Sequence, residues 1–314
     1  MWDNLISSDK LVAAPETNST IGVWTDYCEL LCLVSDNQEI DHDQLCSIII
    51  KSYDFADSDE RKQKNKKDYL TSIIQDVYSH IELRSELLLD KYPFEINADG
   101  QLCLKCNTLT HLQKLYILLL CASNLRYMQR TTCLTSDVEV VSLLYMRKLY
   151  PTMVFKLFGS SNVNKYLSNE DFISEKKLKD RIIKLADFIS VAYEGDIVEQ
   201  ISEHNVGDGG LDIVGIREMG DQRRSIPVMF GQCACSREDW SQKQNSISEM
   251  HWGKSLRTWV TSIQKYIFIP IWNMNSDKRF EDEVKISSCI VVDRLRFMHI
   301  ADDAFLGKCC SFED

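Results

Sequence analysis

Two short segments in the second half of the chain carry residue types that hold a divalent metal. In the first, Gly207-Asp-Gly-Gly-Leu-Asp212 leads into the apolar stretch 213–216, and in the second an apolar stretch that begins at Val228 ends at Gln232. Neighbouring strands would let the side chains of Asp212 and Gln232 converge. A carboxylate, an amide oxygen and the backbone carbonyl that follows form an oxygen-rich site of the kind Mg²⁺ accepts. The glycines permit a tight turn, and a turn without side chains lets a bulky polymer approach the metal.

At these residues the sequence resembles the PD-(D/E)XK nuclease superfamily, and within it the Mrr-type restriction endonucleases. The family pattern is an acid on a first helix, then Asp-x-Gly-x-Asp opening a strand, then Gln-x-Lys on the next strand. Asp208-Gly-Gly-Leu-Asp212 and Gln232-Cys-Ala match the second and third elements, and the resemblance covers roughly residues 175–270. It implies that Asp212, Gln232 and the Cys233 carbonyl hold Mg²⁺ or Mn²⁺, and that water activated by the metal attacks a phosphodiester.

The third element departs from the family pattern because Ala234 stands where the family has lysine. That lysine would orient or deprotonate the attacking water and stabilise charge on the phosphate. Two interpretations follow: either the amine comes from Lys243, in the segment after the strand, or the site is catalytically inactive. Arg237 is closer in sequence but too basic to act as a general base. We favour Lys243 as the replacement.

The acid on the first helix is expected on the segment 178–193, whose apolar residues form one helical stripe. Asp180 lies on that segment and is the predicted catalytic acid, although it is placed opposite the apolar stripe. Glu175 and Glu194 are the competing candidates.

Contacts to nucleic acid are predicted at His204, Arg237, Lys254 and Arg257. His204 precedes the glycine-rich turn, and the other three follow the Gln232 strand in a region that contains the tryptophans Trp240, Trp252, Trp259 and Trp272. Basic side chains interleaved with aromatic rings are typical of a nucleic-acid groove. The helical spacing of the tryptophans favours packing in the core for at least two of them.

The first half of the chain has the pattern of a helical domain. Apolar residues recur every three or four positions in 26–34, 70–78, 112–125 and 138–150, and the segment 94–104 alternates about an Asn-Ala-Asp-Gly turn, which predicts a small hairpin. A stretch of turn-forming residues after Leu157 then reads as a linker. We therefore predict a helical partner-binding or oligomerisation domain over 1–160 and a restriction-endonuclease-like domain over 168–314.

The second half predicts the order helix, three strands, helix, strand. The expected strands are 197–201, 211–216 and 226–235, joined as an antiparallel meander, followed by a helix over 239–260 and strands over 267–271 and 286–292. The fold class is α+β overall, with a C-terminal α/β domain in which a central mixed sheet is flanked by helices.

Composition limits the classes of function. The net charge is −11, divided as −7 for residues 1–150 and −4 for residues 151–314, which argues against a general nucleic-acid coat. The twelve cysteines are dispersed, and the N-terminus lacks the pattern of a secretory signal, so a reducing, cytoplasmic compartment is expected. No apolar stretch has the length needed to span a bilayer.

The resemblance and the composition lead to one functional hypothesis and one alternative. The hypothesis is a Mg²⁺-dependent DNA endonuclease, the regulated effector of a bacterial anti-phage defence system. Its partners would be DNA and protein subunits bound through the helical domain, with further copies of the chain among the candidates. The alternative is a catalytically inactive nuclease-fold subunit that binds nucleic acid or scaffolds a defence complex.

Overall fold

The computed structural model describes residues 11, 13–16, 19–52, 60–106, 108–128, 134–159, 167–173, 175–221, 223–257 and 262–302. The chain forms two compact units. The first comprises residues 1–131, 272–281 and 312–314, and the second comprises residues 132–271 and 282–311. The fold class is mixed α/β, and the second unit contains the mixed sheet flanked by helices that the sequence predicts for the C-terminal half.

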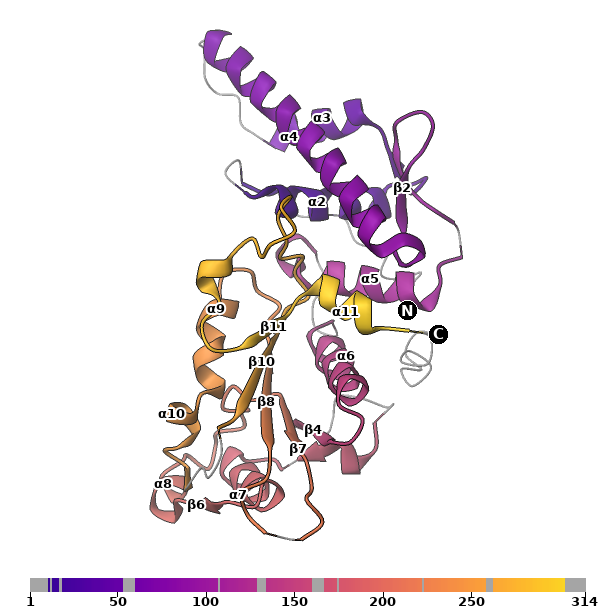
Figure 1. The fold of residues 1–314 in the computed structure, drawn as a ribbon. Coiled ribbons are helices and arrows are strands. Elements are labelled where there is room, and N and C mark those ends of the chain that lie inside the picture. The colour runs from indigo at the N-terminus through magenta and orange to yellow at the C-terminus, as the bar shows by residue number, and fades with distance from the viewer. Residues whose placement is uncertain are drawn as a thin grey trace. The chain divides into compact units, whose positions relative to one another are not determined.

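The first unit combines helices with a small antiparallel sheet (Figure 1). Its helices are α2 (Ile21–Val34), α3 (His42–Ser52), α4 (Glu60–Leu88) and α5 (His111–Ala122), with 3₁₀ turns at Leu89–Lys91 and Leu125–Tyr127. The strands β1 (Glu39–Ile40), β2 (Phe94–Ile96) and β3 (Leu102–Leu104) pair in the order β1-β3-β2. The predicted hairpin is confirmed as β2 and β3, and its turn closes through a bond from the Gly100 N–H to the Asn97 carbonyl, 3.0 Å long.

The second unit is built on a six-stranded mixed sheet of order β11-β10-β8-β7-β4-β5. Its strands are β4 (Val154–Phe158), β5 (Phe172–Ile173), β7 (Ile213–Ile216), β8 (Val228–Cys233), β10 (Gln264–Phe268) and β11 (Ile290–Val292). The strands β4, β7 and β8 are antiparallel neighbours, whereas β10 runs parallel to β8 and β11 runs parallel to β10. The central strands are almost wholly buried because helices cover both faces.

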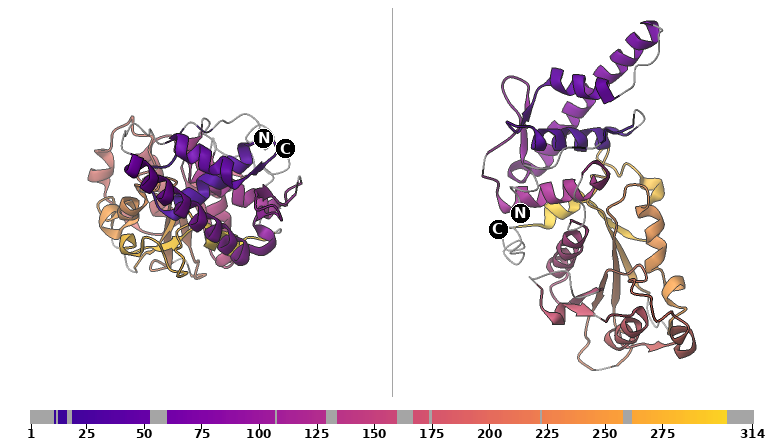
Figure 2. Two further views of the ribbon diagram at one scale, coloured as in Figure 1. Left: turned by 90° about the horizontal axis from the view of Figure 1, so that it is seen from above. Right: turned by 180° about the vertical axis from the view of Figure 1, so that it is seen from behind.

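Helices flank this sheet on its two faces (Figures 1 and 2). On one face lie α6 (Leu134–Leu149), which packs on β4, β7 and β8, and α11 (Arg294–Ile300), which packs on α6. On the other lies the segment formed by α9 (Trp240–Lys243), the 3₁₀ turn η5 (Gln244–Ile247) and α10 (Glu249–Trp252). The remaining elements are α7 (Leu178–Phe188), α8 (Gly195–Glu199), the two-stranded sheet of β6 (Ala192–Tyr193) and β9 (Leu256–Arg257), and the 3₁₀ turns Asn169–Asp171 and Glu283–Lys285.

Two predicted elements are wrong. The expected strand over 197–201 is the short helix α8, because the Ile197 and Val198 N–H groups bond back to the Glu194 carbonyl and begin a helical turn. The expected continuous helix over 239–260 is interrupted, because the Ser248 side chain accepts the His251 N–H and caps a new helix, α10.

The two units also divide the chain at a different place from the predicted boundary. The helix α6 and the strand β4, which the sequence patterns assigned to the domain over 1–160, belong to the second unit. The physical reason is that β4 pairs with β7 and so joins the central sheet. Of the predicted linker after Leu157, residues 160–166 lie outside the described part of the chain.

Candidate metal and catalytic site

Asp212 lies directly before β7, at the centre of the sheet. The β7–β8 register pairs Ile213 with Gly231, so Asp212 lies opposite Gln232, as the sequence predicts. Its backbone bonds to both neighbouring strands, since its N–H donates to the Gly231 carbonyl at 3.0 Å and its carbonyl accepts from the Phe158 N–H at 2.8 Å. The Cys233 N–H donates to its carboxylate at 2.6 Å. The side chain is therefore held in one orientation and is 7% exposed.

The glycine-rich turn before Asp212 needs a residue without a side chain at Gly210. Gly210 has φ +77°, and a Cβ there would lie 2.5 Å from the Ser246 Cβ. The Gly210 N–H donates to the Asp208 carboxylate at 2.7 Å, which closes the turn. The Asp208 side chain thus shapes the loop that leads to Asp212, in agreement with a turn-forming role.

Gln232 is buried on β8, and its amide oxygen contacts the hydroxyl of Ser246 from η5. That hydroxyl also lies 2.9 Å from the Gly210 carbonyl and 2.6 Å from the Lys243 carbonyl. The Ser246 hydroxyl therefore contacts polar groups of β8, the glycine-rich turn and α9. An amide oxygen has two lone pairs, so Gln232 retains an acceptor for a metal while it contacts Ser246.

Glu139 on α6 is the acidic residue that the sequence patterns missed. It is half-buried, and burial together with the charges of Asp212 and Asp208 raises its pKa to about 8. Burial and the Asp208 charge likewise raise the pKa of Asp212 to about 7. The two carboxyl groups interact because α6, the helix that precedes the first strand of the meander, packs on β7 and β8. The structure thus places an acid on the first helix, on an element other than the one expected.

Asp180 is half-exposed in the first turn of α7 and is not among the charges that shift the pKa of Asp212 or Glu139. Its predicted role as the first acid is therefore unsupported. The competing candidates are engaged in ion pairs, Glu175 with Lys184 at 2.5 Å and Glu194 with Arg257.

Instead of an acid, α7 contributes Arg181 to the loop. The Arg181 guanidinium is buried and donates to the carbonyls of Val206 and Gly207, both at 2.6 Å. It also lies 5.6 Å from the centre of the Phe158 ring and interacts with the Asp208 charge. Arg181 therefore fixes the residues that enter the glycine-rich turn.

Lys243 ends α9 and acts electrostatically on the acidic pair. Its positive charge lowers the pKa of both Glu139 and Asp212, in opposition to the larger effect of burial. It also opposes the burial that raises the pKa of the Cys235 thiol to about 12. Ala234 is completely buried, and its N–H donates to the Phe268 carbonyl at 2.9 Å. Lys243 is thus near the acids, whereas its catalytic role stays a prediction.

The residues predicted to contact nucleic acid are dispersed. His204 lies in an exposed turn and Lys254 is exposed, whereas Arg237 is half-buried and Arg257 is ion-paired with Glu194. Trp240 and Trp252 are 2% and 3% exposed, so they pack in the core and present no stacking surface. Trp259 lies outside the described residues.

A metal site at this position would combine few carboxylates with neutral oxygen ligands. Within the described ranges, no group of three or more His, Cys, Asp or Glu side chains is arranged to hold a metal ion. The candidate ligand set contains two carboxylates, from Glu139 and Asp212, with the Gln232 amide and the Cys233 carbonyl. Hard oxygen ligands of this kind suit Mg²⁺ and Mn²⁺ rather than zinc.

Comparison of the chain with protein-family models, with curated proteins and with solved structures finds no match. Among the described helices, none is both long and apolar enough to cross a membrane.

Proposed function

We propose that the second unit is a Mg²⁺-dependent nuclease domain that hydrolyses phosphodiester bonds. The observation that carries the proposal is the strand register that places Asp212 opposite Gln232, with the Cys233 N–H bonded to the Asp212 carboxylate. Glu139 on α6 and Lys243 on α9 are close enough to shift the pKa values at this position. The helix α6, the antiparallel strands β4, β7 and β8, the α9–α10 segment and the parallel strand β10 follow the order expected for the restriction-endonuclease-like fold. This order supports the resemblance that begins at Asp208-Gly-Gly-Leu-Asp212.

The residues present fit a divalent cation. Among the described residues, Lys243 is the positive charge that lowers the pKa values of both Glu139 and Asp212, and burial still raises both. A divalent cation would offset the negative charge of the two ionised carboxylates. Glu139, Asp212, Gln232 and the Cys233 carbonyl would hold the ion. When bound, Mg²⁺ supplies Lewis-acid stabilisation of the phosphate and lowers the pKa of water.

The other residues of the site have positioning and electrostatic roles. Lys243 would stabilise the charge that develops on the phosphoryl oxygens, which is the role the family assigns to the lysine replaced by Ala234. Ser246 and the Cys233 N–H orient Gln232 and Asp212, and Arg181 holds the loop before them. We infer that the chain is the DNA-cleaving effector of an anti-phage defence system. The first unit would bind a protein partner or a second copy of the chain.

The test begins with metal binding, which needs no activating partner. Calorimetric titration with Mn²⁺ should show one tight site in the wild type that Asp212→Asn and Glu139→Gln each weaken at least tenfold. Asp180→Asn is the matched control and should bind as the wild type does. Equal affinity in the wild type and Asp212→Asn would exclude the metal site.

Cleavage then separates the enzyme from its alternative. Supercoiled plasmid and a single-stranded RNA are incubated with Mg²⁺ and the wild type, Asp212→Asn or Lys243→Met. Nicking by the wild type alone supports the DNA endonuclease with Lys243 as the replacement lysine. Full activity of Lys243→Met would remove that residue from the mechanism, and cleavage of RNA only would change the substrate class. If the wild type binds Mn²⁺ and nucleic acid but does not cut, both as purified protein and in cell extract, the chain is the catalytically inactive nuclease-fold subunit instead. The alanine at position 234 is the observation that favours this alternative.

A further inference from the structure

The helix α4 is longer than the part of it that packs in the first unit. It has 29 residues, which is about 43 Å of helix at 1.5 Å per residue. Among its described side chains the first buried one is that of Ile73, and the stripe continues with Ile74, Val77, His80, Ile81, Arg84 and Leu88. The turns before Ile73 extend beyond α2 for about 20 Å (Figure 1).

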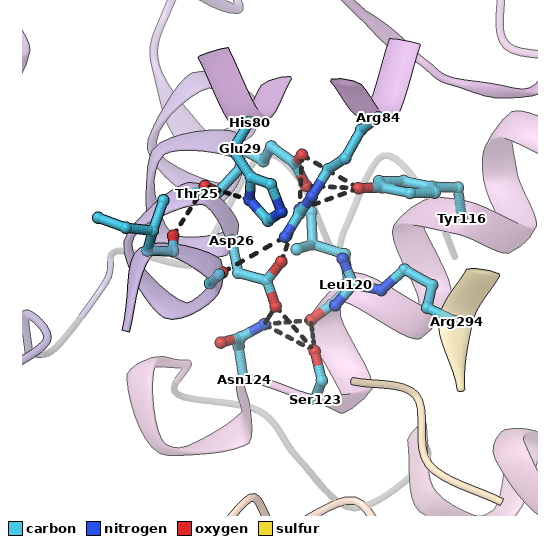
Figure 3. Close-up of polar contacts among 12 residues, drawn as sticks. Thr25, Asp26, Glu29, His80, Arg84, Tyr116, Leu120, Ser123, Asn124 and Arg294 are labelled. Atoms are coloured by element: carbon cyan, nitrogen blue, oxygen red, sulfur yellow. Dashed lines mark hydrogen bonds and ion pairs between the residues drawn. The ribbon is translucent and has the colours of Figure 1, made fainter. Parts of the chain in front are cut away.

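Buried polar contacts fix the second half of α4 to α2 (Figure 3). The Arg84 guanidinium lies 2.7 Å from the Asp26 carboxylate and 2.8 Å from the Glu29 carboxylate, and all three side chains are completely buried. One helical turn before Arg84, the His80 ring lies 3.0 Å from the Thr25 hydroxyl. These contacts position α4, and the turns before Ile73 continue the same helix past them.

The projecting turns carry the densest run of basic residues in the chain. Five of the seven residues 61–67 are basic, namely Arg61, Lys62, Lys64, Lys66 and Lys67. With the acids at either end, the segment 60–68 has a net charge of +3, whereas the whole chain has a net charge of −11. A local excess of positive charge in an acidic chain attracts a polyanion to this segment.

Two of the lysines occupy positions that would otherwise face the core. Residues 62 and 66 precede Ile73 by eleven and by seven positions, so they fall on the same helical stripe as Ile73. The apolar stripe therefore ends in lysine, which explains why α4 leaves the core here. Lys62 and Lys66 are also four residues apart, and like charges at that spacing destabilise a helix. An anionic partner would remove this repulsion.

The five basic positions are distributed around the whole helix. Successive helical residues are about 100° apart, and the widest arc without a basic position is about 100°. An acidic protein surface would meet only one face of the helix, whereas a helix in the major groove of DNA has a phosphate backbone on each side. The groove of B-form DNA is about 12 Å wide and admits a helix, whereas the groove of A-form RNA is too narrow.

We propose that residues 60–72 of α4 bind double-stranded DNA by lying in its major groove, with the basic residues 61–67 close to the phosphates. Release of counterions from the phosphates would supply most of the affinity, so binding would depend little on base sequence. The contact would hold the polymer that the proposed nuclease site of the second unit cleaves. The proposal concerns binding alone and does not depend on the metal site.

The test measures binding of the full chain to a short fluorescein-labelled DNA duplex in EDTA, where cleavage by a metal-dependent site cannot occur. Combined Arg61→Gln, Lys62→Gln and Lys64→Gln should weaken binding at least tenfold. It should also reduce the slope of log K against log salt by about 2.7, because each phosphate contact contributes about 0.9. The same variant should bind Mn²⁺ as the wild type does, which separates failure of this proposal from failure of the nuclease proposal.

The matched control removes three positive charges elsewhere. Lys176, Arg223 and Arg224 are exposed and lie outside α4, so their combined replacement by glutamine should leave the salt dependence close to that of the wild type. An equal loss of affinity in the control would show that binding follows the net charge of the chain, and it would overturn the proposal.

A second variant tests the helical geometry at constant charge. Asn65→Pro keeps all five basic residues but removes a bond of the helix and breaks it within the run. Affinity should fall at least tenfold, while cooperative urea unfolding is retained because the buried stripe begins at Ile73. Unchanged affinity of Asn65→Pro, equally tight binding of double-stranded RNA, or no binding of the DNA duplex at low salt would each overturn the proposal.

Discussion

The raised pKa values of Glu139 and Asp212 predict that metal binding depends steeply on pH. With values of about 8 and about 7, both carboxyl groups are largely protonated near pH 6 when no metal is bound. A divalent cation must displace those protons, so its apparent affinity falls as the pH is lowered. The affinity for the metal falls at low pH because both pKa values are raised, which means that the protein favours the protonated, neutral form of each carboxyl group.

The size of the effect follows from the two values. Treating the pair as two titrations near 7 and 8, the affinity should rise on the order of several hundred-fold between about pH 6 and about pH 8.5. In Glu139→Gln only the proton of Asp212 remains to be displaced, so the rise should shrink to roughly tenfold over the same range. Asp180→Asn should show the full wild-type dependence.

Calorimetric titration with Mn²⁺ in two buffers of different ionisation enthalpy measures both the affinity and the number of protons released. Near pH 6 the wild type should release close to two protons and Glu139→Gln close to one. An affinity that is constant from pH 6 to 8.5, with no proton release, would show that the carboxylates are already ionised and would refute the reasoning.

Three further predictions concern stability, each measured by urea unfolding of the metal-free chain. The folded state raises the pKa of Asp212, so the stability of the chain is highest while this group is protonated in both states and falls as the pH rises from about 4 to about 8. Asp212→Asn removes the buried negative charge and should therefore raise the free energy of unfolding at pH 8, by roughly 2–4 kcal/mol. Gly210→Ala should lower the free energy of unfolding more than Gly220→Ala does. Both glycines have φ +77°, where an alanine is strained by about 1–2 kcal/mol, but of the two only a Cβ at Gly210 would clash with a neighbour, Ser246. Equal losses of stability would contradict the close approach of Ser246. Arg84→Met should destabilise the first unit by about 3–5 kcal/mol, since the buried carboxylates of Asp26 and Glu29 lose the ion pairs with Arg84, and adding Asp26→Asn should recover part of the loss.

The local sequence pattern located the central pair of the site. The apolar stretches on either side of the polar loop predicted two adjacent antiparallel strands, and their pairing places Asp212 opposite Gln232. The glycines before Asp212 were interpreted as a tight turn, and Gly210 has the positive φ that such a turn requires. These features depend on residues close together in the chain, where alternation and turn chemistry are informative.

The local sequence patterns did not show which segments form the first helix and the first strand of the antiparallel meander. The segment 197–201 has a short apolar run that fits a strand or a helix equally well, and it forms α8. The segment 138–150 was correctly interpreted as a helix but was assigned to the first domain. A signal was present, since Pro151 ends that helix and the alternating stretch Val154–Phe158 follows at once. Periodicity reveals which face of a helix is apolar, but it carries no information about which sheet that face covers.

The sequence by itself determined the chemistry that Asp212 and Gln232 offer, the absence of lysine at Ala234 and the mixed sheet flanked by helices in the second half. The tertiary structure alone decided that Glu139 completes the acidic pair, that Lys243 lies close to it and that Arg181 holds the loop. These three side chains come from α6, α9 and α7, elements far apart in the chain that are brought together by burial of their apolar faces. Long-range packing of this kind depends on the summed fit of many side chains, which no single spacing encodes.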